Sequence, residues 1–265
     1  MDVLVTGATG FIGSNLAESL KASGARVHAL VRNPGRLGFL AGLDVHVLEG
    51  DLFRVPDLPA DLEAVFHVAG MTKYLKPEAY YTVNRDETAS LLDAVIRRGS
   101  RPKFVFLSSL SASGPSAPGE TRKESDPPAP VTHYGRSKLA AEAEVLRRRD
   151  DLPVSVARVG VVYGPRDPEF ARYFRLVKRG LLPVIGREKT PLGVCYVKDL
   201  CRGLQLLASH PAAAGEIFNF GHPAVSSMED IGRRAAEILG LRPRRVVFPL
   251  PVVGGIALTG EVISR

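Results

Sequence analysis

The stretch Thr6-Gly7-Ala8-Thr9-Gly10-Phe11-Ile12-Gly13 follows the first apolar run of the chain and opens its first segment of helical periodicity. Gly7 permits a tight turn, Gly10 lets the backbone approach a pyrophosphate, and Gly13 lets helix and strand pack closely. The helix N-terminus offers unpaired N–H groups and a positive dipole end. A glycine triplet alone is weak evidence, but this position between a first strand and a first helix predicts a phosphate-binding turn. The residues expected to contact the cofactor there are Gly7, Thr9, Gly10, Phe11 and Ile12.

Outward from this turn, short β-branched runs alternate with longer stretches of helical period as far as about residue 157. The predicted strands are 3–5, 27–31, 45–48, 64–68, 104–107 and 154–157. The predicted helices are 12–23, 77–98 and 132–149. Several strands are apolar on both faces, as strands covered by helices on each side must be. The alternation predicts an α/β fold with a doubly wound parallel sheet and right-handed crossovers.

The regular alternation weakens beyond about Val159, where helical stretches at 169–178, 197–209 and 227–239 accompany short strands such as 217–220. We therefore expect two domains. Residues 1–158 would form a dinucleotide-binding domain, and residues 159–265 a smaller C-terminal substrate-binding lobe with segments that return to the sheet. The segment from Ser111 to Pro130 is rich in Pro, Gly and Ser and lacks periodicity, which is typical of a functional or mobile loop.

The composition excludes several classes of protein. In a chain of 265 residues, 45% hydrophobic and 24% charged residues exclude a disordered, a collagen-like and a coiled-coil chain. Two cysteines exclude a disulfide framework or a Cys-rich zinc site, and the six histidines lack metal-ligand spacing, so no metal is predicted. The N-terminus has no basic segment before an apolar run, which predicts a cytoplasmic protein. Residues 246–260 are too short and too broken by Pro and Gly to span a bilayer.

The net charge of +7 and a pI near 9.6 favour anionic partners, which include phosphorylated cofactors, nucleic acid and acidic membrane surfaces. The basic clusters 97–98, 147–149 and 233–234 fall toward the ends or faces of helices and have no interleaved aromatic residues. We therefore expect no nucleic acid and no membrane among the partners.

The end of the second predicted strand bears on the choice of cofactor. NAD-selective folds usually place Asp or Glu there, to accept a hydrogen bond from the ribose 2′-OH. Here the chain reads Val31-Arg32-Asn33-Pro34-Gly35-Arg36 and has no carboxylate. Arg32 would attract a 2′-phosphate and bond it bidentately, with Arg36 as a second cation. The alternative is a pair of solvated loop arginines. The prediction is NADP, with NAD as the alternative.

A Ser–Tyr–Lys set follows the fifth predicted strand. Tyr134 and Lys138 are four residues apart and share one helix face, and Ser109 stands at the strand end. An ammonium group beside a phenol favours the phenolate, so Tyr134 would exchange a proton with a carbonyl or an alcohol. Lys138 would also hold the nicotinamide ribose, and Ser109 would hydrogen-bond the same substrate oxygen. Since ligands bind at the carboxyl ends of strands in such sheets, the location agrees.

In this combination the chain resembles the extended short-chain dehydrogenase/reductase family, also called NAD-dependent epimerase/dehydratases, over nearly its whole length. The resemblance implies a Rossmann sheet, dimerisation through the helices at 77–98 and 132–149, and Ser109, Tyr134 and Lys138 as catalytic residues. Further motifs of the family match Gly50-Asp51-Leu52, His67-Val68-Ala69-Gly70, 81–92, 158–165 and 196–200. By this resemblance Asp51, Leu52, Ala69, Gly70, Val159 and Val162 also contact the cofactor.

Departures from the family patterns narrow the reaction. Ser109-Leu110-Ser111 stands where dehydratases carry Thr-Asp-Glu, which disfavours a dehydratase. Leu192 stands where epimerases carry an arginine that grips the nucleotide diphosphate, although Arg187 or Lys189 would be a substitute. The remaining branch resembles dihydroflavonol reductases and 3β-hydroxysteroid dehydrogenases. This favours an NAD(P)-dependent oxidoreductase that transfers a hydride between nicotinamide and a carbonyl/secondary alcohol pair. The alternatives are an NAD-dependent nucleotide-sugar epimerase and a non-catalytic NADP-binding sensor.

Overall fold

The computed structural model describes residues 1–73, 76–117, 119–186, 190–224 and 226–248. The chain divides into two compact units. The first comprises Met1–Gly160 and Cys195–Phe220, and the second Val161–Val194 and Gly221–Arg265. Residues Cys195–Phe220 thus belong with the N-terminal part. The sequence-based division placed them in a C-terminal lobe with segments that return to the sheet. They belong there because they supply one helix and one strand to the first unit.

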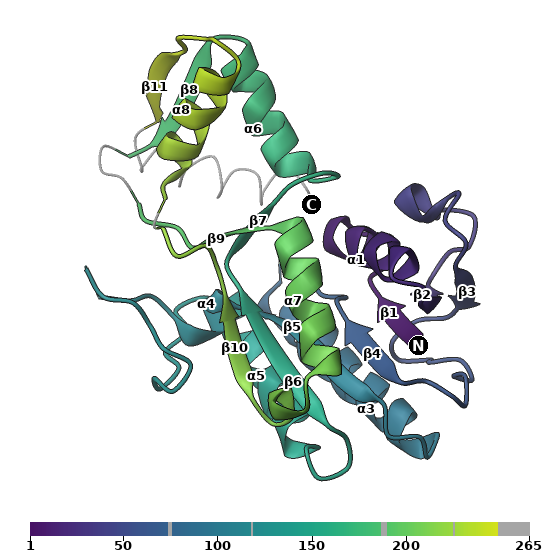
Figure 1. The fold of residues 1–265 in the computed structure, drawn as a ribbon. Helices are drawn as coiled ribbons and strands as arrows, with labels where there is room; N and C mark the ends of the chain where they lie inside the picture. Colours follow the sequence, from purple (N-terminus) through teal and green to yellow (C-terminus); the bar gives the residue numbers. More distant parts are fainter. Residues whose placement is uncertain (74–75, 118, 187–189, 225, 249–265) are drawn as a thin grey trace. The chain divides into compact units, whose positions relative to one another are not determined.

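A parallel sheet of seven strands forms the centre of the first unit (Figure 1). Its strands are β1 (Asp2–Thr6), β2 (Arg26–Val31), β3 (His46–Glu49), β4 (Ala64–His67), β5 (Lys103–Ser109), β6 (Val154–Val159) and β10 (Ile217–Phe220). Their order is β10-β6-β5-β4-β1-β2-β3, and all neighbouring strands are parallel. The winding direction reverses between β1 and β4, which is where such sheets bind ligands. The predicted doubly wound α/β fold is confirmed.

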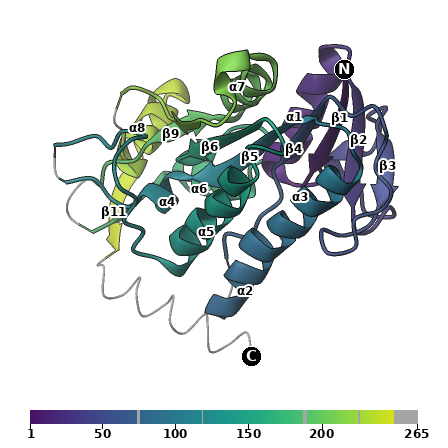
Figure 2. The same cartoon turned by 90° about the horizontal axis from the view of Figure 1, so that it is seen from below.

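Helices cover both faces of this sheet. Figures 1 and 2 show α1 (Phe11–Ala22) and α7 (Val197–Ser209) on one face, and α3 (Glu87–Arg97) and α5 (His133–Arg147) on the other. Side chains such as Leu4, Phe104 and Phe106 are fully buried between the layers. Because the helices bury both faces, the strands need the two-sided apolar pattern seen in the sequence.

The predicted helix at 77–98 has three parts. They are α2 (Pro77–Tyr81), a π-helical turn η2 (Thr82–Asp86) and α3. Short helices lie at η1 (Gly38–Leu40), α4 (Leu110–Ser113) and η3 (Pro211–Ala213), and α4 begins the segment predicted to be a loop. The base of that loop is closed, since Ala129 N donates to Ser113 O at 2.8 Å.

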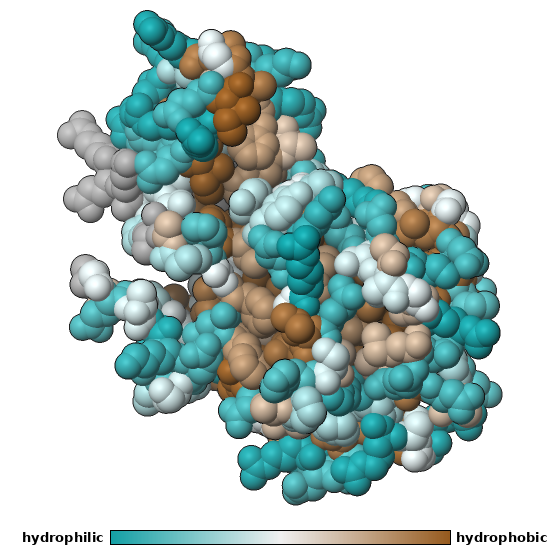
Figure 3. All heavy atoms as spheres, viewed as in Figure 1, coloured by the Kyte–Doolittle hydropathy of each residue, from teal (hydrophilic) through white to brown (hydrophobic). Residues whose placement is uncertain are grey.

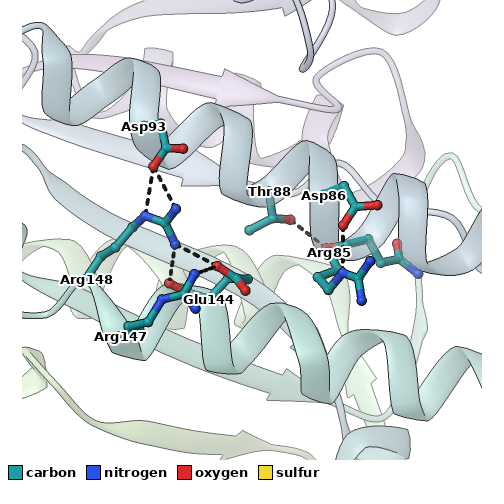
Figure 4. A network of polar contacts seen from close by, with 8 residues as sticks. Arg85, Asp86, Thr88, Asp93, Glu144, Arg147 and Arg148 are labelled. Atoms are coloured by element: carbon teal, nitrogen blue, oxygen red, sulfur yellow. Dashed lines mark hydrogen bonds and ion pairs between the residues drawn. The ribbon is translucent and has the colours of Figure 1, made fainter.

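An ion-pair network connects α3 to α5 (Figure 4). The Arg148 guanidinium lies 2.6 Å from Asp93 Oδ1 on α3 and 2.8 Å from Glu144 Oε2 on α5. Arg147 also pairs with Glu144. Arg148 is only partly exposed, so this bridge is less screened by solvent than a surface ion pair. It holds together the two helices that cover one face of the sheet.

The second unit consists of two helix–strand pairs. They are α6 (Pro168–Lys178) with β8 (Leu181–Ile185), and α8 (Met228–Ile238) with β11 (Arg244–Phe248). The two strands are parallel neighbours. The unit also contains β7 (Val161–Tyr163), and β9 (Val194–Tyr196) spans its boundary with the first unit. Val177, Leu182, Val184 and Ala236 form its core.

Candidate active site

The turn between β1 and α1 has the backbone that the glycines predict. Gly7 has φ +66°, a value that favours glycine. Its carbonyl accepts from Gly10 N at 3.0 Å. A Cβ atom on Gly13 would lie 2.2 Å from Gly7 O, so only glycine fits at that point of the first helical turn. These contacts bring the start of α1 against the end of β1.

The N-terminus of α1 is open toward an anion. Gly10 is its N-cap residue, no side chain caps the helix, and no acidic residue lies in its first turn. Thr9 and Gly10 are exposed, and Phe11 and Ile12 are half-buried. The first N–H groups of the helix are therefore available to a phosphate, and the dipole favours negative charge there. The turn fits the pyrophosphate of a dinucleotide.

Arg32 and Arg36, at the end of β2, both have exposed side chains. Arg32 lies close enough to Glu87 to lower the pKa of that carboxyl, although burial raises it more. Glu87, in the first turn of α3, was not among the residues selected from the sequence. Asp51 Oδ1 accepts from Phe53 N at 2.8 Å and from Arg54 N at 2.6 Å, and Leu52 is buried beside it. Asp51 therefore holds its own loop in shape.

Ala69 and Gly70 link the glycine turn to α5. A Cβ on Gly7 would lie 2.8 Å from both N and Cα of Ala69. A Cβ on Gly70 would lie 3.6 Å from Lys138 Nζ and 3.2 Å from Asn84 Oδ1. The phosphate turn, the end of β4 and Lys138 therefore form one continuous surface.

The Ser109 hydroxyl lies close enough to the Tyr134 phenol to lower the pKa of that phenol. Ser109 ends β5 and caps α4, where its Oγ accepts from Ser111 N at 3.2 Å. Thr132 caps α5 by accepting from Gly135 N at 3.0 Å. A Cβ on Gly135 would lie 2.3 Å from Ser111 O, so this glycine lets α5 approach the end of β5. Tyr134 is thereby placed over Ser109.

Lys138 is 4% exposed and lies one turn farther along α5. Its Nζ donates to Leu107 O at 2.7 Å and lies 4.2 Å from the centre of the Phe106 ring. Burial lowers the pKa of Lys138 to about 7, against the opposing charge of Glu142. The buried amine is therefore held at the carboxyl end of β5, beside Ser109.

The electrostatics of Tyr134 differ from the expectation that Lys138 makes its phenol more acidic. Burial raises the pKa of Tyr134, the nearby Ser109 hydroxyl lowers it less, and the neighbouring Tyr80 raises it. The Lys138 ammonium instead donates a hydrogen bond to the Leu107 carbonyl and lies over the Phe106 ring. Tyr134 is therefore protonated at neutral pH and suited to donate a proton.

Asn84 joins the surroundings of this site, although the sequence singled it out only as part of a helix motif. It is 1% exposed and lies in the π-helical turn. Its amide donates to Ser137 Oγ at 2.9 Å, and its Oδ1 accepts from Met71 N at 2.8 Å. Ser137 Oγ in turn donates to Tyr134 O at 2.8 Å. Asn84 thus fixes the first turn of α5.

A buried ion pair joins α5 to β6. Arg158 and Glu142 are 2% and 1% exposed, and their closest atoms are 2.7 Å apart. Ser108 Oγ donates to Glu142 Oε1 at 2.5 Å, and Arg158 donates to Ser113 Oγ at 3.0 Å. The pair therefore connects β5, α4, α5 and β6 directly behind Ser109 and Lys138.

The remaining predicted residues lie in different units. Val159 is buried at the end of β6 in the first unit, next to Ser109 in the strand register. Val162 lies in β7, in the second unit. Over the described ranges, no cluster of three or more His, Cys, Asp or Glu residues suits a metal ion.

His67 is a buried histidine between two threonines. Its Nδ1 lies 2.7 Å from Thr6 Oγ1, and its Nε2 lies 2.8 Å from Thr88 Oγ1. Because Thr88 donates to Asn84 O at 2.7 Å, it accepts from Nε2–H, and Nδ1 accepts from Thr6. Burial lowers the pKa of His67 to about 3, so the ring is neutral.

We expect His67 to make the protein acid-sensitive. Its folded pKa lies below the unfolded value, so its contribution to stability is present above the unfolded pKa and is lost as pH falls toward 3. Between pH 6.5 and 5 the loss is about 1.5 kcal/mol. Urea unfolding at both pH values measures it. His67→Gln keeps a donor and an acceptor and should reduce this pH dependence; an equal slope in both proteins contradicts the assignment.

Comparison with known proteins agrees with this geometry. Residues 3–221 match the model of the NAD dependent epimerase/dehydratase family. A ceramide reductase of Caulobacter vibrioides is 30% identical over 99% of this chain and 77% of its own length. A UDP-glucose 4-epimerase of Vibrio cholerae is 29% identical over 82% of this chain and 69% of its own length. The solved structure of MoeE5 in complex with UDP-glucose and NAD is 31% identical, with a TM-score of 0.78, and the match covers 94% of this chain and 85% of that one.

The family match spans most of the chain, and it includes the glycine turn, the end of β5 and the first turns of α5. The chain therefore belongs to the NAD dependent epimerase/dehydratase family and is an NAD(P)-dependent enzyme of the extended short-chain dehydrogenase/reductase type.

Proposed function

We propose that the protein is an NADP(H)-dependent reductase or dehydrogenase for a carbonyl/secondary alcohol pair. The observation that carries this proposal is the proximity of Ser109 to Tyr134, with Lys138 one helical turn farther on. The three residues lie at the carboxyl end of β5, and Ala69 and Gly70 connect Lys138 to the phosphate turn. This is the location at which a doubly wound sheet binds its ligands.

The proposed chemistry assigns one task to each side chain. A bound nicotinamide dinucleotide would exchange a hydride with the substrate carbon. Tyr134 Oη would donate a proton to the carbonyl oxygen in reduction and accept it in oxidation. Ser109 would donate a hydrogen bond to the same oxygen as negative charge develops on it. Lys138 would bind the nicotinamide ribose. The raised pKa of Tyr134 keeps the proton on the phenol at neutral pH, which is the form that donates a proton in reduction.

Arg32 supports NADP as the preferred cofactor, and we expect Arg32→Ser to weaken NADPH binding by roughly 10- to 100-fold, because a charge-assisted hydrogen bond is lost. NADH affinity should stay within about twofold, since NADH has no 2′-phosphate. Fluorescence titration with both cofactors measures this. Arg26→Ser at the other end of β2 is the matched control. Tighter binding of NADH than of NADPH by the unchanged protein contradicts the NADP proposal.

A nucleotide-sugar epimerase is the second candidate, because the solved structure with UDP-glucose and NAD and the Vibrio cholerae epimerase are both similar to this chain. Leu192 argues against it, since its half-buried apolar side chain cannot grip a diphosphate. Its substitutes Arg187 and Lys189 lie outside the described residues. A panel of apolar ketones and UDP-sugars with NADPH and NAD separates the two. Oxidation of NADPH in the presence of a ketone supports the reductase. Interconversion of UDP-sugars without net oxidation or reduction of the cofactor supports the epimerase.

The non-catalytic sensor remains the third candidate. The proximity of Tyr134 to Ser109 argues against it, because a sensor needs no proton donor at the end of β5. The structure contains no helix long and apolar enough to cross a bilayer within the residues it describes. The cytoplasmic location stays a prediction.

We also propose a homodimer formed through α3 and α5. Ala143 is exposed on α5, and Ala89 and Ala140 are half-buried on the outer sides of the two helices. Small residues there allow helices of a second copy to approach closely. Ala143→Arg is expected to shift a dimer of about 57 kDa to a monomer in analytical ultracentrifugation, since two cations would meet at the interface. Arg202→Ala on the exposed side of α7 is the control, and a monomeric parent protein contradicts the proposal.

A further inference from the structure

The positive charge of the chain is concentrated in the second unit. Its sequence contains 13 Lys and Arg residues against 7 Asp and Glu residues, a net charge of +6. The first unit contains 22 against 21, a net charge of +1. A cofactor bound at the glycine turn, which belongs to the first unit, does not explain this asymmetry. The charge of the second unit needs an explanation of its own.

One end of the second unit brings several of these cations together. Both helices lead through short turns into parallel strands, so the last turns of α6 and α8 and the first residues of β8 and β11 lie at the same end. Arg244 pairs with Leu181 in the strand register, and Arg244 N donates to Gly180 O at 2.7 Å. We call this end the tip. Its exposed residues are Arg175, Leu176, Lys178, Arg179, Leu181, Arg234, Glu237, Ile238, Leu239, Arg242 and Arg244.

Large aliphatic side chains are exposed at the tip. Ile238 is 74% exposed, Leu239 50%, Leu181 42% and Leu176 37%. A single exposed Leu is ordinary, but here four large aliphatic side chains are exposed at the same end of one unit. Figure 3 shows brown apolar atoms among teal polar atoms over this unit, which contains α6, α8, β8 and β11. Exposure of these apolar side chains to water is unfavourable, so binding to a partner with an apolar layer would be favourable.

The cations around these side chains have few anionic partners. Within the described ranges, no ion pair joins Lys178, Arg179, Arg242 or Arg244 to a carboxylate. Elsewhere in the same unit arginines do pair, as Arg233 and Arg245 do with Glu229. The one acidic residue of the tip, Glu237, pairs with Arg234. Helix dipoles account for Lys178 at the end of α6. They do not account for Arg242 and Arg244, which lie beyond the end of α8.

We propose that the tip docks the protein onto the surface of a bilayer that contains anionic lipid. Ile238 and Leu239 enter the boundary between headgroups and acyl chains, and Lys178, Arg179, Arg242 and Arg244 lie against lipid phosphates. This is peripheral binding and requires no membrane-spanning helix. It departs from the sequence-based expectation of no membrane partner, because the sequence alone did not place the cations and the aliphatic side chains at one end.

Two other occupants fit the tip less well. Nucleic acid offers phosphates for the cations, but aliphatic side chains have no base face to stack on, and the tip exposes no aromatic residue in the described ranges. A second copy of the chain would cover the apolar side chains, but a symmetric contact would place equal positive charges against each other. An anionic bilayer satisfies both parts of the tip at once.

The test is cosedimentation of the whole chain with vesicles of phosphatidylcholine alone and of phosphatidylcholine with one quarter phosphatidylglycerol. We expect binding to the anionic vesicles, little binding to the neutral ones, and loss of binding in 0.5 M salt, roughly the regime of a few-ångström Debye length. The variant Arg179→Gln/Arg242→Gln/Arg244→Gln should bind roughly 100-fold more weakly, at roughly fivefold per cation. Ile238→Ser/Leu239→Ser should also weaken binding.

A matched control removes the same charge from the first unit. Arg97→Gln/Arg149→Gln/Arg202→Gln lowers the net charge equally, at exposed positions of the first unit, and should bind within about twofold of the unchanged protein. Equal losses in both triple variants overturn the proposal, because net charge alone would then govern binding. Absence of binding to anionic vesicles overturns it too. A monomer–dimer shift caused by Ile238→Ser/Leu239→Ser without vesicle binding would assign the tip to a second copy instead. NADPH affinity should be unchanged in all variants.

Discussion

Replacing Tyr134 by phenylalanine is expected to lower kcat for carbonyl reduction by a factor of about 10²–10⁴, the usual contribution of a positioned acid or base. Ser109 would still hydrogen-bond the substrate oxygen, but no group would deliver the proton. NADPH affinity should remain within about twofold, because the phosphate turn and Arg32 are untouched. Turnover is measured with the ketone selected from the substrate panel, and affinity by fluorescence titration.

The neighbouring tyrosine supplies the matched control. Tyr80 lies with its ring centre 6.2 Å from that of Tyr134 and raises its pKa. Tyr80→Phe should change kcat by less than about tenfold, since it removes no reacting proton. Unchanged turnover in Tyr134→Phe removes the phenol from the mechanism, and equal losses in both variants mean that ring packing rather than proton transfer was altered.

The same assignment predicts a direction in the pH profile. Because burial raises the pKa of Tyr134, the phenol keeps its proton up to and beyond the ordinary tyrosine range. Reduction should therefore not weaken through loss of this proton until the pH rises well into the alkaline range. A loss of reductive kcat centred near pH 7 would point to Lys138, whose pKa is about 7, as the controlling group.

Replacing Arg158 by methionine is expected to destabilise the protein by about 3–5 kcal/mol, because the carboxylate of Glu142 would be left buried without its partner. The guanidinium makes three hydrogen bonds to Glu142, of 2.7–3.2 Å, besides its bond to Ser113. Urea unfolding followed by circular dichroism gives the change in the free energy of unfolding. This is the largest stability effect we expect from a single substitution.

A second variant separates the ion pair from its packing. Glu142→Gln/Arg158→Met removes both charges and should be more stable than Arg158→Met alone, since no buried charge is left uncompensated. The double variant should also lower the pKa of Lys138 further, because Glu142 raises it. If Arg158→Met unfolds at the same urea concentration as the unchanged protein, Glu142 must take up a proton or reach solvent, and the pair is not the support described for Ser109 and Lys138.

The sequence alone was sufficient for the parts of the fold that depend on local chemistry. The glycine spacing at Gly7, Gly10 and Gly13 follows from close backbone contacts, and the two-sided apolar strands follow from helices on both faces. The alternation of strand and helix then leaves few topologies. The common helix face of Tyr134 and Lys138 could be predicted in the same way, since residues four apart share one face of a helix.

Features that depend on residues distant in the sequence could not be predicted from the sequence alone. The apolar face of α7 suits either unit, so its period could not assign Cys195–Phe220 to the first one. Nothing in 77–98 marks the π-helical turn that directs Asn84 toward Ser137. The ammonium of Lys138 turns to the Leu107 carbonyl because that group lies within reach only once β5 and α5 are packed.

The interleaving of the two units has a consequence for synthesis on the ribosome. Strand β6 is an outer strand of the sheet until β10 reaches it, and Val161–Val194, part of the other unit, is made in between. Until Phe220 has left the exit tunnel, the six apolar or buried residues of β6 present an open row of backbone donors and acceptors. Such open edges invite pairing with other nascent chains. The growing polypeptide therefore passes through an interval of aggregation risk for β6 that ends only when β10, the last strand of the sheet to be made, is in place.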